Sequence, residues 1–193
     1  MSSDITRNIM IVGVGGQGTL LASKLLGDVL IHNGYDVKVS EVHGMSQRGG
    51  SVVTYVRYGS SVASPVIETG EADIVLAFEL LEAARYLPYL KKGGFLLANN
   101  NRIDPMPVIT GVAEYPKDLE KKLAEQPIEF VCIDALSLAE KAGSSKAVNV
   151  VLLGLLAKHM DFPKEAWLEA IRNTVPERFL ELNLRAFSLS YEE

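Results

Sequence analysis

Glycines near the N-terminus have the spacing of backbone sites that bind phosphate groups. Three of them follow the pattern G-x-G-x-x-G directly after the apolar run Ile9–Val12, and a helix-like pattern begins at Thr19. Glycine accepts positive φ angles at low cost and leaves no side chain between a ligand and the backbone. Unpaired N–H groups at the start of a following helix attract anions. The predicted site residues of this turn are Gly13, Gly15, Gly16, Gln17 and Gly18.

A second segment, between Glu41 and the pair Gly49–Gly50, is dense in hydrogen-bond donors. A guanidinium group is a planar fork suited to phosphate or carboxylate, and serine and glutamine side chains can donate to anionic oxygens. We therefore expect this loop to contact a ligand at the carboxyl edge of the sheet, where open α/β sheets bind them. The candidate residues are His43, Ser46, Gln47 and Arg48.

Each motif also has a structural interpretation. The glycines can serve only to let a strand and a helix pack closely, His43 can bond a backbone carbonyl, and Arg48 can pair with Glu41 or Glu68. Glu41 also lies about 20 residues beyond the glycines, where a dinucleotide fold places its ribose-binding acid. A free-standing NAD(P)- or nucleotide-binding Rossmann-like protein is therefore the alternative function.

Alternating strand and helix patterns must position these loops. Strands are expected near residues 8–12, 37–42, 51–58, 62–63, 74–78, 95–98 and 130–133. Helices are expected over 19–33, 79–90, 116–125, 136–142 and 146–160. A T-x-x-E capping box at Thr174 and Glu177 predicts the start of a last helix, which ends near Leu189. The alternation predicts a three-layer α/β fold with a mostly parallel Rossmann-like sheet, helices on both faces and a helical C-terminal segment. We expect one domain over 1–193, with a core of 8–160 and a helical segment 161–193.

Composition excludes several classes of function. The chain has 193 residues and a net charge of −5, without a basic block, which argues against nucleic acid as a partner. No apolar run reaches the roughly 20 residues that span a bilayer, and we expect no membrane contact and a cytoplasmic location. The histidines lack metal-ligand spacing, so no metal site is expected. The single cysteine, Cys132, is expected to be a small core residue, with a catalytic thiol as the alternative.

Polar residues at three further places in the chain are candidates for the site. Glu79 and Glu82 follow a predicted strand and either face the ligand cleft or lie in a solvated helix start. The run Asn99–Asn101 also follows a strand end. Asn149 lies inside an apolar helix, where a hydrogen bond between helices is favoured over ligand contact.

The glycine run 13–18 together with the loop 41–50 resembles the gamma-type subunits of 2-oxoacid:ferredoxin oxidoreductases, most of all the beta subunits that act in indolepyruvate:ferredoxin oxidoreductases. The likeness covers roughly residues 8–155, with further matches at Ser64–Pro65, Ala72–Asp73, Phe78–Glu79 and from Asn149 to Gly154. The resemblance implies a holoenzyme that oxidatively decarboxylates an arylpyruvate such as indolepyruvate, forms an acyl-CoA and reduces ferredoxin.

The resemblance also implies that thiamine diphosphate and iron–sulfur clusters belong to a large alpha subunit. This chain has no G-D-G…N-N thiamine motif, and one cysteine cannot hold a cluster. We therefore expect a supporting subunit with no catalytic residues of its own, whose C-terminal helices dock the partner or a second copy of the chain. Because both loops suit anions, the hypothesis is that they hold CoA near the partner's thiamine site.

Overall fold

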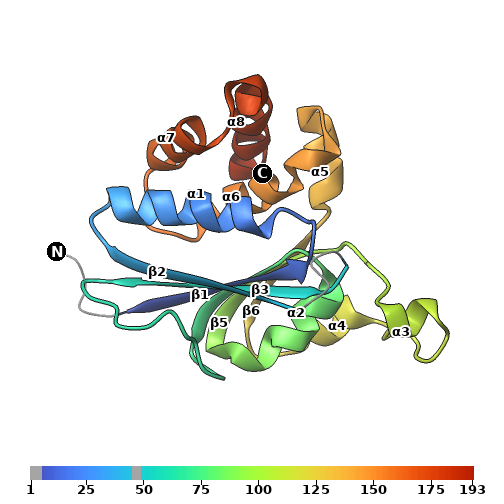
Figure 1. Ribbon diagram of the computed structural model, residues 1–193. Coiled ribbons are helices and arrows are strands. Elements are labelled where there is room, and N and C mark those ends of the chain that lie inside the picture. The colour runs from blue at the N-terminus through green and yellow to red at the C-terminus, as the bar shows by residue number, and fades with distance from the viewer. Residues whose placement is uncertain (1–5, 45–48) are drawn as a thin grey trace.

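The computed structural model describes residues 6–44 and 49–193 and consists of a six-stranded sheet with helices on both faces (Figure 1). The predicted site residues Ser46, Gln47 and Arg48 therefore lie outside the described residues. The strands are β1 (Arg7–Val14), β2 (Asp36–His43), β3 (Ser51–Gly59), β4 (Ala72–Ala77), β5 (Leu90–Asn99) and β6 (Glu129–Ile133).

The strand order in the sheet is β2-β3-β1-β4-β5-β6. Strands β1, β4, β5 and β6 are parallel neighbours, whereas β3 pairs antiparallel with both β1 and β2. The prediction of a mostly parallel sheet is confirmed, since β3 alone runs against the others. The exception follows from the short connection after His43, because a hairpin joins antiparallel strands and a parallel pair needs a long crossover.

Helices form the two outer layers. They are α1 (Thr19–His32), α2 (Leu80–Tyr86), α3 (Met106–Ile109), α4 (Leu119–Ala124), α5 (Ala135–Ala142), α6 (Val148–Lys158), α7 (Lys164–Thr174) and α8 (Glu177–Glu192). Figure 1 shows α1 and α5 to α8 on one face of the sheet and α2 and α4 on the other. The short helix α3 projects from the side of the molecule toward which β1 and β2 point (Figure 1).

Three local predictions in the middle of the chain are wrong. No strand forms at 62–63, because the N–H of Val62 donates to the Asp36 carboxylate (2.7 Å) rather than to a strand. The helix predicted over 79–90 ends at Tyr86, and Pro88 lies in a separate 3-10 turn, η1 (Leu87–Tyr89). Strand β5 begins at Leu90 rather than near residue 95, so Gly93–Gly94 lie within it, beside a register shift against β4.

The predicted capping box at Thr174 is also wrong. Thr174 is the last residue of α7, and the N-cap of α8 is Pro176, without a side-chain cap. The helix expected over 146–160 is shorter, because the 3-10 turn η2 (Ser145–Ala147) precedes α6.

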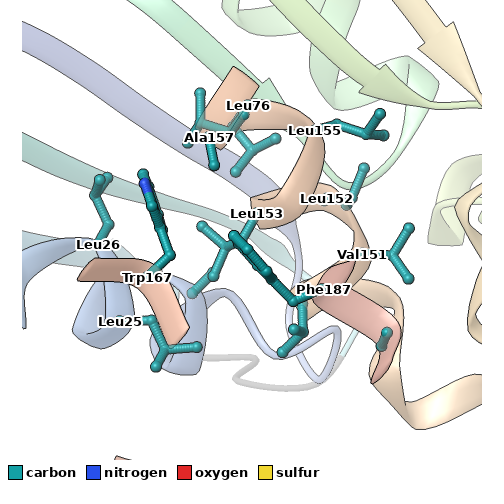
Figure 2. Packing of buried hydrophobic residues seen from close by; sticks show 14 of the residues in the cluster. Leu25, Leu26, Leu76, Val151, Leu152, Leu153, Leu155, Ala157, Trp167 and Phe187 are labelled. Atoms are coloured by element: carbon teal, nitrogen blue, oxygen red, sulfur yellow. The ribbon is translucent and has the colours of Figure 1, made fainter. Parts of the chain in front are cut away.

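Helix α6 forms the centre of the main core, as its apolar sequence predicts. Figure 2 shows Leu25 and Leu26 of α1, Trp167 of α7 and Phe187 of α8 packed around its leucines. Trp167 is only 1% exposed. The C-terminal helices thus share a core with the sheet-covering helices. The single-domain assignment stays a prediction. Among the described residues, no helix has both the length and the apolar character needed to cross a membrane.

Candidate functional site

The glycine turn leaves the end of β1 and becomes the first turn of α1. Gly18 is the N-cap of α1 and has a φ of +86°, which favours glycine. No side chain caps this helix start, and its first turn contains no acidic residue. The first N–H groups of a helix have no partner within it. The turn therefore keeps the features that attract an anion.

Gln17 braces the turn. Its side-chain oxygen accepts a hydrogen bond from the N–H of Val14 (2.7 Å), and its side-chain nitrogen donates to the carbonyl of Phe78 (3.0 Å). A Cβ on Gly13 would lie 2.8 Å from the Gln17 oxygen and 2.9 Å from Cβ of Phe78. Gly16, by contrast, has a φ of +103° and no atom within 4 Å of an added Cβ. Gly13 and Gln17 thus hold the ends of β1 and β4 together, and the open side of the turn is at Gly16.

The second loop returns to the glycine turn. The N–H of Gly15 donates to the carbonyl of Gly50 (2.9 Å), and the N–H of Gly49 donates to the carbonyl of Gly15 (3.3 Å). Nδ1 of His43 lies 3.1 Å from the carbonyl oxygen of Gly44, in line with its structural interpretation. The fold therefore brings the two predicted motifs to one place at the carboxyl edge of the sheet.

Two cavities flank the glycine turn. The β2 cavity has a volume of about 380 Å³. Its lining residues are Gly15, Gly16, Gly18, Thr19, Leu20, Glu41, His43 and Val52. The α6 cavity, on the other side of the turn, has a volume of about 480 Å³. Its lining residues are Gly16, Gln17, Gly18, Asn99, Asn101, Ile103, Leu136, Ser145, Lys146, Val148 and Asn149.

The sequence did not predict Ser145 and Lys146 as site residues. They stand at the turn that precedes α6, and only the fold brings them to the glycines. Asn149 makes the predicted contact between helices, since its Nδ2 donates to the carbonyl of Gly18 at 3.4 Å. Asn101, which follows β5, was recognisable as a polar residue after a strand end.

The solvated interpretation of Glu79 and Glu82 is wrong, because they are 1% and 4% exposed. Glu79 accepts hydrogen bonds from the hydroxyl of Tyr115 (2.6 Å), the N–H of Ile103 (3.2 Å) and the N–H of Glu82 (2.9 Å). Burial and the bonded carboxylate raise the pKa of the Tyr115 hydroxyl. Glu82 accepts from the hydroxyl of Ser51 and from Nε of Arg85 (3.1 Å). The two carboxylates thus anchor both loops that frame the site.

Glu41 does not occupy the position of a ribose-binding acid beside β1. In the dinucleotide fold the second strand is the neighbour of the first. Here β3 lies between β1 and β2, and Glu41 accepts a hydrogen bond from Thr54 on β3 (3.4 Å). A salt bridge between Glu41 and Arg48 stays a prediction, because Arg48 lies outside the described residues.

Two other kinds of site to consider are a reactive thiol at Cys132 and a metal-binding centre. Burial raises the pKa of the Cys132 thiol to about 12, which keeps it protonated and weakens the interpretation as a catalytic thiol. Within 6–44 and 49–193, no group of three or more histidine, cysteine, aspartate and glutamate side chains could hold a metal ion.

Comparison with known proteins identifies the family. The family model for pyruvate ferredoxin/flavodoxin oxidoreductase matches residues 8–193. Indolepyruvate oxidoreductase subunit IorB of Thermococcus kodakarensis is 47% identical over 187 residues, which cover 94% of this chain and 93% of that protein. The IorB protein of Pyrococcus horikoshii is 46% identical with the same coverage.

A solved structure agrees with these sequence matches. The gamma subunit of a keto/oxoacid ferredoxin oxidoreductase from Geobacter sulfurreducens has a TM-score of 0.71 and 26% identity, and the match covers 96% of each chain. Together with the family match over 8–193, this likeness shows that the chain belongs to the pyruvate ferredoxin/flavodoxin oxidoreductase family.

Proposed function

We propose that this chain is the small subunit of an indolepyruvate-type 2-oxoacid:ferredoxin oxidoreductase and that it binds CoA for a larger partner subunit. Both IorB relatives are named as subunits and match nearly the whole chain. The holoenzyme oxidises a 2-oxoacid, releases carbon dioxide, forms an acyl-CoA and passes two electrons to ferredoxin. We expect this enzyme to act in the cytoplasm.

The larger subunit would hold thiamine diphosphate and the iron–sulfur clusters. An iron–sulfur cluster does not fit the donors of this chain, because burial raises the pKa of its one cysteine to about 12 and the described residues contain no group of potential metal ligands. The sequence also lacks the G-D-G…N-N motif that binds thiamine diphosphate. The chain therefore contributes binding and orientation, and the redox chemistry belongs to the partner.

The observation that carries the CoA proposal is the pairing of Gly15 with Gly49 and Gly50. This pairing joins an uncapped helix start to the loop that contains Arg48. Helix N-termini and guanidinium groups both bind phosphate, and CoA carries three phosphate groups. In this proposal Gly16, Gly18 and Arg48 hold the phosphates, and the bound CoA presents its thiol to the partner. Direct ligand contacts by Gln17, His43, Ser46 and Gln47 remain predictions.

Substitution of Arg48 tests the proposal. In the assembled enzyme, we expect Arg48→Ala to raise the apparent KM for CoA at least 10-fold and to leave the KM for the 2-oxoacid within twofold, because the loss is that of a phosphate contact. Arg172→Ala is the matched control, since this exposed arginine lies on α7 and pairs with Glu165. Equal changes in both constants would instead indicate a purely structural loop.

A further inference from the structure

The segment that carries α3, residues 105–113, exposes apolar side chains and contains no charged one. Met106, Ile109 and Val112 are 64%, 66% and 83% exposed, and they are the most exposed large apolar side chains in the described parts of the chain. No residue of this segment belongs to either of the two hydrophobic cores of the described chain. Figure 1 shows α3 clear of the sheet and of the other helices. We call residues 105–113 the α3 arm.

The exposed side chains of the α3 arm are gathered on one small element. Met106 and Ile109 are three residues apart on α3, so they share a face of the helix. The N–H of Val112 donates to the carbonyl of Pro107 (2.9 Å), which folds the chain after α3 back toward the helix. The hydroxyl of Thr110, the one polar side chain of the arm, donates to the carbonyl of Met106 (2.9 Å). Contiguous exposed apolar surface of this kind marks a site of protein interaction.

The base of the α3 arm is firmly held. The N–H of Ile103 (3.2 Å) and the hydroxyl of Tyr115 (2.6 Å), on either side of the arm, donate to the same buried carboxylate oxygen of Glu79. The guanidinium carbon of Arg102 lies 4.3 Å from the centre of the Tyr115 ring. An element that is ordered before binding loses little conformational entropy when a partner docks on it. The arm is therefore suited to present fixed apolar anchors.

The α3 arm stands beside the loop that is proposed to hold CoA. One cavity of about 310 Å³ has Gly49, Gly50, Pro105 and Met106 among its lining residues. The arm and the end of the loop that contains Arg48 therefore share a wall of this cavity. A subunit that accepts the thiol of CoA at this edge of the sheet must approach over the arm.

We propose that the α3 arm docks into an apolar pocket of the larger subunit, with Ile109 and Val112 as its anchors. This inference rests on the proposed function, which requires the larger subunit to meet the carboxyl edge of the sheet. A few well-packed apolar side chains carry most of the binding energy of a typical interface. A second copy of the chain on the arm would instead cover the edge at which the thiol must leave. The arm also has no basic side chain to attract a nucleic acid.

Charged substitutions on the arm test the inference in the assembled enzyme. We expect Ile109→Asp and Val112→Asp each to raise the dissociation constant between the two subunits at least 10-fold, because a carboxylate would enter an apolar pocket. Dilution of the co-expressed enzyme in the analytical ultracentrifuge measures this constant. The KM for CoA of the fully assembled variants should stay within twofold of the wild-type value, because neither residue lines a cavity at the glycine turn.

Val66→Asp is the matched control. Val66 is an exposed valine whose carbonyl accepts a hydrogen bond from Arg57 (2.8 Å), and Arg57 pairs with Asn8 near the start of β1, at the opposite edge of the sheet. This variant should keep the wild-type dissociation constant within twofold. The thermal midpoints of all three isolated variants should match that of the wild-type chain, because the substituted side chains lie outside both cores.

The inference is overturned if both arm variants bind the larger subunit as tightly as Val66→Asp does. It is also overturned if the isolated wild-type chain dimerises and the arm variants abolish only that dimer. Failure of the proposed function has other signatures. If the wild-type chain forms no complex with a larger subunit, both proposals fall. If the arm variants weaken the complex but Arg48→Ala leaves the KM for CoA unchanged, docking by the arm stands and the CoA role of the chain fails.

Discussion

Two buried carboxylates account for the shape of the site at the scale of single residues. A buried charge is costly unless its oxygens are fully hydrogen-bonded, and then it fixes its partners in place. Glu79 binds Ile103 and Tyr115 of one loop, and Glu82 binds Ser51 at the end of the other. Glu79 is the N-cap of α2 and Glu82 lies in its first turn, so the start of one short helix positions both walls of the ligand edge.

The hydroxyl of Tyr115 provides a direct measure of this anchoring. We expect Tyr115→Phe to lower the free energy of unfolding by about 1.5–3 kcal/mol, because it removes a hydrogen bond to a charged, buried oxygen of Glu79. Urea denaturation measures the change. Tyr89→Phe is the control, since the hydroxyl of Tyr89 makes no hydrogen bond in the described parts of the chain. Equal losses in the two variants would contradict the anchoring role.

At the scale of elements, the sequence predicts what local pattern determines. The apolar character of α6 and the glycine turn after β1 are both visible in the sequence, and both are confirmed. The capping box predicted at Thr174 does not form, because α7 extends through Thr174, the residue that would have capped α8. Lys146 became a site residue only because the turn before α6 reaches the glycines, a contact between segments more than 120 residues apart.

Glycine at 154 sets the distance between α6 and α8. A Cβ there would lie 2.7 Å from the carbonyl oxygen of Phe187 and closer still to the hydroxyl of Ser190. We expect Gly154→Ala to lower the free energy of unfolding by about 1–3 kcal/mol through overpacking. The matched variant is Gly27→Ala within α1, where an added Cβ meets no atom within 4 Å. Thermal denaturation should show that this variant gains about 0.5–1 kcal/mol from helix propensity. A neutral Gly154→Ala would mean that α8 adjusts freely.

At the scale of the whole molecule, the candidate ligand site and the larger hydrophobic core lie at different parts of the sheet. Its carboxyl edge gathers the glycine turn, the pair Gly49–Gly50 and the projecting segment that carries α3. The layer of α1 and α5 to α8 encloses the larger core (Figure 2). The sequence predicted the layers but not the position of β3 between β1 and β2. Either strand of the β2–β3 hairpin could pair with β1, and the choice depends on the packing of the complete sheet.

The single-domain prediction can be tested with the only tryptophan of the chain. Trp167 lies on α7, within the segment 161–193, and packs against Leu25 and Leu26 of the core 8–160 (Figure 2). If the two parts form one domain, tryptophan fluorescence and far-UV circular dichroism should report the same denaturation midpoint. A fluorescence midpoint well below that of circular dichroism would show that the C-terminal helices unfold first as a separate unit.

Removal of residues 161–193 is the second test, and it should abolish the cooperative transition. The truncation would expose the buried leucines of α1 and α6 that Trp167 and Phe187 now cover. If the truncated chain still melts cooperatively, its stability does not depend on this shared core.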